Sequence, residues 1–266
     1  MITKNTIKYI HSLSQKKYRD AARCFVVEGP KAVTDLLPYL SCRCLYATEE
    51  FQTRIASRLP SFRVKEVVCI TQQELERLSQ LRTPRDCVAL FEMPASDESW
   101  QDWATVAQSE LCLALDGVQD PGNLGTILRI ADWFGIRHVF ASPDTADVYA
   151  PKVVQATMGA IGTVRVHYGS LPALLQPLKG RLPIYGTFLD GEDLYTQQLS
   201  SSCGVIVMGN EGKGITSEVG ACVTHRLLIP SFAAEGCASE SLNVAVATAI
   251  VCAELRRQGR SEIVRW

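Results

Sequence analysis

Three segments of the chain combine glycine-rich turns with polar side chains that could bind or activate a substrate. The first contains three glycines and places Asn123 and Arg129 six residues apart. An arginine near the start of a helix can reach back to the preceding loop and hold a phosphate in its planar fork. A structural alternative is equally ordinary, with Asn123 as a helix N-cap and Arg129 on the surface.

The second segment, 209–215, follows the apolar run 204–208 and has glycines at three of six positions. Glycines permit positive φ angles and let the backbone approach a ligand closely. A phosphate-binding P-loop requires another spacing and a hydroxyl residue after Lys213, and no Gly-x-Gly-x-x-Gly opens a helix after a strand. The segment is therefore either a ligand-binding loop of another class or a structural turn.

The third segment joins Ile229-Pro230 to Ser241-Leu-Asn243, which precedes a long apolar helix. Ser241 suits the N-cap of that helix, which would put Asn243 inside its first turn. Asparagine is unusual there in a helix that only fills a core. We therefore expect Asn243 to face a site between elements.

Metal chemistry is not expected. No set of histidines, cysteines and carboxylates has ligand spacing, and no Cys-x-x-Cys pair occurs. The four histidines share no motif and are expected to be structural or exposed: His11, His138, His167 and His225. The ten cysteines predict buried, reduced thiols in a cytoplasmic protein.

An open parallel sheet would position the three segments. Short apolar runs predict strands at 111–115, 139–141, 183–188, 204–208 and 226–229, and helices at 123–134, 150–159 and 241–258. Continuous apolar strands separated by helices are typical of a parallel sheet covered on both faces. Ligands bind beyond the carboxyl ends of such strands, where these segments lie.

The first 95 residues predict a separate, smaller α/β sandwich. Its expected helices are 6–22, 31–40 and 72–81, and its expected strands are 24–27, 44–47, 64–70 and 87–91. An acidic, polar stretch follows, which we interpret as a linker at 96–108 before a second domain at 109–266.

Composition narrows the class of protein. With 47% hydrophobic and 21% charged residues, the 266-residue chain is neither disordered nor fibrous. No apolar run approaches the roughly 18 residues of a membrane span, and the N-terminus has no secretory signal. Residues 1–95 carry 15 basic and 10 acidic residues, whereas 96–266 carry 12 and 18. The basic part either meets a polyanion or presents solvated helix faces.

Taken together, the three segments resemble the SpoU/TrmH family of RNA ribose 2′-O-methyltransferases. The similarity lies in Asn123-x-Gly-x-x-x-Arg129, Met208-Gly-Asn-Glu-Gly-x-Gly214, and Ile229-Pro followed by Ser241-Leu-Asn-Val-Ala-Val-Ala247. Lys16-Lys-x-Arg19, Phe25-Val-Val-Glu-Gly29 and Thr83-Pro84 resemble the family's substrate-binding domain. The stretch 231–240 is longer than the family's usual link.

The resemblance implies an α/β fold whose C-terminal, mostly parallel sheet carries a deep trefoil knot, which general topology rules would exclude. It also implies an N-terminal α/β RNA-binding domain like a ribosomal protein, S-adenosyl-L-methionine as cofactor, and a homodimer. The implied catalytic residues are Arg129, Asn123, Glu211, Ser241 and Asn243. The implied cofactor-binding residues are Met208, Gly209, Asn210, Gly214, Ile229, Pro230 and Leu242, and the implied RNA-binding residues are Lys16, Lys17, Arg19 and Arg23.

Methyl transfer to a ribose hydroxyl needs alignment of nucleophile and methyl group, and no metal. Because a guanidinium keeps its proton in proteins, we expect Arg129 to orient the RNA phosphate and stabilise developing alkoxide charge. Glu211 would hold this arginine or its loop. The expected substrate is ribosomal RNA; the alternatives are transfer RNA, an inactive RNA-binding protein, and a different nucleotide-dependent enzyme, whose phosphate-binding spacings are missing.

Overall fold

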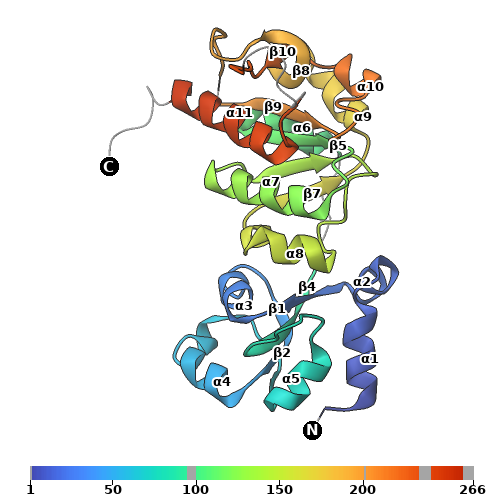
Figure 1. Ribbon diagram of the computed structural model, residues 1–266, viewed down its shortest axis with the longest axis vertical. Coiled ribbons are helices and arrows are strands. Elements are labelled where there is room, and N and C mark those ends of the chain that lie inside the picture. The colour runs from blue at the N-terminus through green and yellow to red at the C-terminus, as the bar shows by residue number, and fades with distance from the viewer. Residues whose placement is uncertain (1, 95–99, 201, 234–240, 260–266) are drawn as a thin grey trace. The chain divides into compact units, whose positions relative to one another are not determined.

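The computed structural model describes residues 2–94, 100–200, 202–233 and 241–259, without the side chains of 100–102. Its contacts divide the chain into two compact units (Figure 1). The first unit comprises Met1–Ala95 and Asp147–Thr163, and the second comprises Ser96–Ala146 and Val164–Trp266. The segment 147–163 thus belongs with the N-terminal residues, although the sequence placed it in the C-terminal domain. The functional division into domains stays a prediction.

The first unit is a small α/β domain, as predicted. Its four-stranded sheet has the order β1-β4-β2-β3, in which β4 is antiparallel to both neighbours and β2 is parallel to β3. The strands are β1 (Cys24–Glu28), β2 (Cys42–Ala47), β3 (Val67–Cys69) and β4 (Cys87–Glu92). The helices are α1 (Lys4–Ser12), α2 (Lys16–Ala22), α3 (Pro30–Leu36), α4 (Glu49–Ile55), α5 (Gln72–Leu78) and α8 (Pro151–Thr157).

The predicted helix 6–22 is two helices, because the chain turns between α1 and α2. The hydroxyls of Ser12 and Ser14 donate to the carbonyls of Tyr9 and His11, three residues back. Such local side-chain bonds compete with helix continuation. Leu13, inside this turn, is fully buried, so the break still contributes to the core.

The residues just before α8 contact β1 and α2 of the same unit through a pair of rings and an ion pair. The ring of Tyr149 lies 4.8 Å from that of Phe25 on β1. The Arg19 guanidinium is 2.5 Å from the Asp147 carboxylate and donates to the carbonyls of Leu13 and Ser14 at 2.8 and 2.7 Å. Arg19 is only 2% exposed, so it is part of the interior of this unit.

The second unit contains the predicted parallel sheet. Six strands, all parallel, have the order β10-β8-β9-β5-β6-β7. They are β5 (Leu111–Asp116), β6 (His138–Ala141), β7 (Arg165–Tyr168), β8 (Ile184–Asp193), β9 (Gly204–Gly209) and β10 (His225–Leu228). Strand β7 was not predicted, because Arg165-Val-His-Tyr168 is an edge strand without an apolar run.

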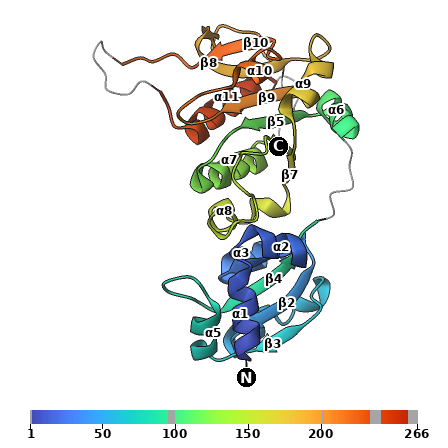
Figure 2. The ribbon, with the colours of Figure 1, turned by 90° about the vertical axis from the view of Figure 1, so that its right-hand side faces the viewer.

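Helices cover both faces of this sheet. They are α6 (Trp100–Ser109), α7 (Pro121–Trp133), α9 (Leu171–Leu175), α10 (Ser217–Gly220) and α11 (Val244–Gln258). Figure 2 shows α7 and α11 on one face, with α6 and α9 on the other. Trp103 and Ala107 of α6 share a core with Leu171, Leu174 and Leu175 of α9.

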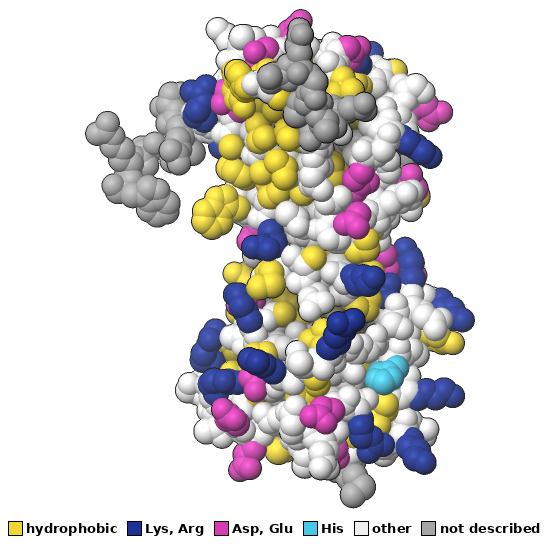
Figure 3. All heavy atoms as spheres, in the orientation of Figure 1, with side chains coloured by type: hydrophobic (Ala, Val, Ile, Leu, Met, Phe, Trp, Pro, Cys, Tyr) yellow, Lys and Arg dark blue, Asp and Glu magenta, His cyan; other side chains and the backbone are white. Residues whose placement is uncertain are grey.

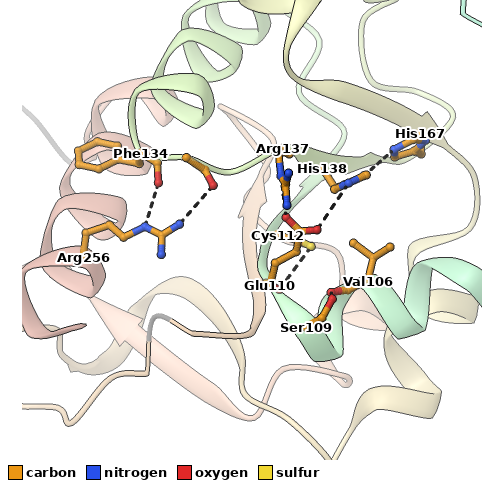
Figure 4. A network of polar contacts seen from close by, with 10 residues as sticks. Val106, Ser109, Glu110, Cys112, Phe134, Arg137, His138, His167 and Arg256 are labelled. Atoms are coloured by element: carbon orange, nitrogen blue, oxygen red, sulfur yellow. Dashed lines mark hydrogen bonds and ion pairs between the residues drawn. The ribbon is translucent and has the colours of Figure 1, made fainter. Parts of the chain in front are cut away.

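A network of rings and charged groups runs from the amino-terminal ends of β5 and β6, at Glu110 and His138, to His167, the third residue of β7, and we call it the amino-terminal edge (Figure 4). Arg137 donates to Glu110 at 3.2 Å, and His138 Nδ1 lies 3.3 Å from His167 Nε2. The ring of Trp103 stacks on His167 with centroids 3.6 Å apart. Burial, with the nearby His138 and Arg165, lowers the pKa of His167 to about 3. This edge therefore holds a neutral imidazole at physiological pH.

The described cysteines are free thiols, most of them buried. Burial raises the pKa of Cys42 and Cys252 to about 12, so both remain protonated and unreactive. Within the described ranges, no group of histidines, cysteines and carboxylates could hold a metal ion. None of the helices in those ranges is both long and apolar enough to cross a bilayer.

Candidate active site

Three loops meet at the carboxyl edge of the second unit's sheet, after β5, β6 and β9. They converge on Gly117, whose φ of +71° favours glycine. A Cβ at this position would lie 3.0 Å from Asp144 Oδ2 and 3.7 Å from Asn210 Cβ. The topology thus brings together segments that are up to 93 residues apart in the chain.

The loop after β9 is a closed turn built on Asn210. Its backbone N–H donates to the Gly214 carbonyl and its carbonyl accepts from Gly214 N–H, both at 2.9 Å. Its side-chain oxygen accepts from the N–H groups of Gly212 and Lys213, and its amide donates to the Gly117 carbonyl at 2.7 Å. A Cβ on Gly209 would lie 2.3 Å from Gly214 C, so only glycine fits there.

Four further polar residues hold these loops, and sequence reasoning missed them. Buried Asp116 accepts from Thr216 N–H at 2.7 Å. The Ser142 hydroxyl accepts from Gly117 N–H at 2.8 Å and donates to Asp144 at 2.5 Å. Thr145 donates to the Leu115 carbonyl at 3.1 Å. Each of the four lies within a few residues of a predicted strand end, which was the available signal.

Three predicted catalytic residues form a hydrogen-bonded chain, which we call the amide relay: Glu211, Asn123 and Asn243. The Asn123 amide donates to Glu211 Oε1 at 2.9 Å, and the Asn243 amide donates to Asn123 Oδ1 at 2.9 Å. The three come from the loop after β9, from α7 and from the start of α11. Both ends of the Asn123 amide are used, so its orientation is fixed by its neighbours.

Two helix starts differ from the sequence-based expectation. Asp120, not Asn123, caps α7, and its side chain accepts from Asn123 N–H at 2.8 Å. Asn243, not Ser241, caps α11, and its Oδ1 accepts from Ala245 N–H at 2.9 Å. Asn243 can serve both as cap and as relay member because its amide has an acceptor and a donor. Ser241 lies exposed before the helix.

Arg129 lies apart from the amide relay within its own chain. At 3.6 residues per turn, a separation of six residues places it about 120° around α7 from Asn123. Its side chain is exposed, and the described part of the chain gives it no hydrogen-bond or ion-pair partner. Glu211 accepts from Asn123, in the segment that leads to Arg129, so of the two predicted alternatives the described contact is with the loop and not with the arginine itself.

The predicted cofactor-binding residues lie along the same edge. Met208 and Gly209 are buried at the end of β9, Ile229 and Pro230 are half-buried after β10, and Leu242 is 50% exposed. Asn210 and Gly214 close the turn described above. Of the long stretch 231–240, only 231–233 fall within the described residues.

The predicted RNA-binding residues divide into exposed and buried groups. Lys16 and Lys17 are exposed on α2, and Arg23 is exposed and donates to the Pro94 carbonyl at 2.8 Å. Arg19 is buried and paired with Asp147. The expectation that Arg19 contacts RNA is therefore wrong, because its guanidinium is used inside the unit.

Two family models match the chain. Residues 110–253 match the SpoU rRNA Methylase family, and residues 4–89 match the MRM3-like substrate binding domain. The first match contains the amide relay and every predicted cofactor-binding residue. The second contains the whole sheet of the first unit except the last residues of β4.

Individual relatives match over nearly the full length. A 23S rRNA (guanosine(2553)-2'-O)-methyltransferase, RlmP of Bacillus subtilis, is 28% identical over 94% of this chain and 95% of its own. A TrmH-family structure from Porphyromonas gingivalis is 42% identical with a TM-score of 0.83, covering 97% of this chain and 99% of that one. An AdoMet-bound rRNA methyltransferase from Sinorhizobium meliloti is 29% identical, with a TM-score of 0.79 over 97% and 96%. The chain belongs to the SpoU rRNA methylase family.

Proposed function

We propose that this protein transfers a methyl group from S-adenosyl-L-methionine to a ribose 2′-hydroxyl of ribosomal RNA. The observation that carries the proposal is the amide relay, which joins three loops at the carboxyl edge of a parallel sheet. Family membership and the names of the relatives support both the reaction and the substrate class. Its similarity to a bacterial 23S rRNA methyltransferase supports a cytoplasmic location.

The residues at this edge fit the cofactor. When bound, S-adenosyl-L-methionine supplies an activated methyl group. In the turn 209–214, Gly212 and Gly214 are exposed and carry no side chain, so their backbone groups are open to a ligand. Half-buried Ile229 and half-exposed Leu242 offer apolar surface for a purine. We assign Met208, Gly209, Asn210, Gly214, Ile229, Pro230 and Leu242 to cofactor binding.

The chain's own residues would hold and polarise the nucleophile. Glu211 keeps its second carboxylate oxygen available while Asn123 holds the first. Asn243 in turn orients Asn123, so the relay fixes a carboxylate at the tip of the β9 loop. Exposed Ser241, two residues before Asn243, would contact the ribose. Arg129 would bind the neighbouring phosphate and stabilise charge on the attacking oxygen.

We further propose a homodimer that completes the site. Exposed apolar side chains lie on α7 and α11, among them Trp133 (84% exposed) and Val246 (49%). Figure 3 shows hydrophobic side chains gathered over these two helices. A patch of this kind marks an interface, and two-fold dimers are the commonest oligomers. Arg129 on the same helix would then meet the amide relay of the partner copy. We also propose that the C-terminal domain carries a deep trefoil knot.

Two measurements test the proposed function. Mapping of ribose methylation in total RNA, with and without the protein, should reveal one nucleotide that depends on it. Calorimetry with S-adenosylhomocysteine, ATP and NAD should show binding of the first alone. Binding of ATP or NAD, or an unchanged methylation map, would contradict the proposal.

A further inference from the structure

The loop from Ser79 to Asp86 joins α5 to β4 and carries two arginines that the proposed function has not used. We propose that Arg82 and Arg85 bind phosphate groups of the RNA substrate, so that this loop is a contact surface separate from Lys16 and Lys17. The inference rests on RNA being the substrate.

The first turn of the loop is fixed to the end of β1. Half-buried Glu28 accepts from the Ser79 hydroxyl, and its two oxygens lie 3.2 and 3.3 Å from Gln80 N. Leu81 N–H donates to the Ser79 hydroxyl oxygen at 3.0 Å. The Glu28 carboxylate thus holds the first residues of the loop in place, and both of its oxygens are used in these hydrogen bonds.

The end of the loop is fixed as well. Asp86 has a φ of +65°, and its carboxylate pairs with Arg54 at 2.5 Å. The Asp86 carbonyl accepts from Thr48 N–H at 2.9 Å, and the Pro84 carbonyl accepts from the Gln72 amide at 3.3 Å. The backbone between the two arginines is therefore held at both ends, and Figure 2 shows the connection between α5 and β4 extending outward from the sheet.

The arginines themselves are available. Arg82 and Arg85 are exposed, and neither guanidinium has a hydrogen-bond or ion-pair partner among the residues that the structure describes. The two carboxylates that anchor the loop, Glu28 and Asp86, are bonded to other groups. Two guanidinium groups on an ordered backbone suit phosphates, because their forks match the oxygens and little backbone order is lost on binding.

Two other exposed or partly exposed cations of the same unit are already paired with a carboxylate. Lys65 pairs with Glu92 at 2.6 Å, and Arg43 contacts the same carboxylate at 3.7 Å. At the end of the loop, Asp86 lines an acidic hollow of about 690 Å³ together with Glu49 and Glu50, and this hollow would repel phosphates. The expected contact surface therefore ends at Asp86.

Salt dependence of RNA binding tests the loop. Binding of the full chain to a short hairpin RNA is measured by fluorescence anisotropy between about 50 and 200 mM KCl, where the slope counts the phosphates neutralised. We expect R82A/R85A to bind more weakly and to flatten the slope by roughly 1 to 2. R82K/R85K should keep the slope, because lysine retains the charge.

The matched control is R43A/K65A, which removes the same net charge from cations that are already paired. It should change the slope less than R82A/R85A does. Equal slopes for the two double variants, or no change in R82A/R85A, would overturn the proposal and indicate a partner other than RNA for this loop. The proposed function can fail on its own. This would be the result if the unsubstituted protein methylated no ribose while R82A/R85A still weakened RNA binding and flattened the salt slope.

Discussion

The two edges of the second unit's sheet use polar side chains in opposite ways. At the carboxyl edge, Glu211 and Asn243 are exposed and are joined by Asn123 across three loops. At the amino-terminal edge, His167 is packed under Trp103, which is 4% exposed. The first arrangement leaves polar atoms facing solvent where a ligand can reach them, and the second contributes to the core. We therefore expect substitutions at the first edge to affect turnover and those at the second to affect stability.

Arg129→Ala should give the largest effect at the carboxyl edge. Removal of a cation that stabilises developing charge costs about a hundredfold or more in turnover. Arg129→Lys should also be impaired, since a point charge lacks the planar fork. Methyl transfer is measured under single-turnover conditions, and calorimetry with S-adenosylhomocysteine should show unchanged binding. Near-normal turnover of the alanine variant would remove Arg129 from the site.

Asn243→Ser should give a smaller effect that separates the relay from the helix cap. Serine caps helices about as well as asparagine, so the melting temperature should stay close to that of the unsubstituted protein. The hydroxyl is too short to replace the amide that donates to Asn123. We expect turnover to fall roughly tenfold, as for the loss of one orienting contact. Asn243→Ala is the comparison variant, because it should lose the contact to Asn123 and also about 1 kcal/mol of helix-capping stability. Equal turnover in Asn243→Ser and the unsubstituted protein would contradict the relay.

The sequence predicted the parallel sheet and the members of the relay, but not their contacts. Apolar runs such as 204–208 identify buried strands locally, and the residues after them mark the functional edge. Which loops meet depends on strand order, and β5 lies between β6 and β9 only because of long-range pairing. The two cap assignments failed for a related reason: several polar residues precede each helix, and tertiary contacts select one.

The sequence of the segment 147–163 does not indicate which of the two units the segment packs with. Its helix was predicted at nearly the observed place, yet the helix packs with β1 of the first unit. The contacts of this segment include the ion pair of Arg19 and Asp147, which are 128 residues apart. From the sequence alone, Arg19 is predicted to be a surface cation like its basic neighbours. The structure shows that it is buried.

At the amino-terminal edge, Trp103→Ala should lower stability and leave chemistry intact. Truncating a buried tryptophan costs about 3 to 5 kcal/mol in the free energy of unfolding. The ring contacts His167 and, at 5.8 Å between centroids, Phe140. Urea unfolding should show this loss, and the free energy of unfolding of Trp103→Phe should lie between those of Trp103→Ala and the unsubstituted protein. Turnover per folded molecule should be unchanged in both variants. A stable but inactive Trp103→Ala variant would contradict the division between the two edges.

The smallest expected effect concerns the pH dependence contributed by His167. Its folded-state pKa is about 3, lowered first by burial and then by His138 and Arg165. An unfolded chain binds a proton at this residue near pH 6.5. Between these values the unfolded state holds the extra proton, so the contribution of His167 to stability is complete above about pH 6.5 and declines as the pH falls.

The expected slope for this group is less than about 1.4 kcal/mol per pH unit, because part of the ring reaches solvent. His167→Gln should be less stable at pH 7, yet it should lose less further stability between about pH 6.5 and pH 4 than the unsubstituted protein does. Urea unfolding at several pH values gives both slopes. Parallel profiles for His167→Gln and the unsubstituted protein would show that the ring titrates normally, and that the amino-terminal edge is more open to water than its stacking on Trp103 implies.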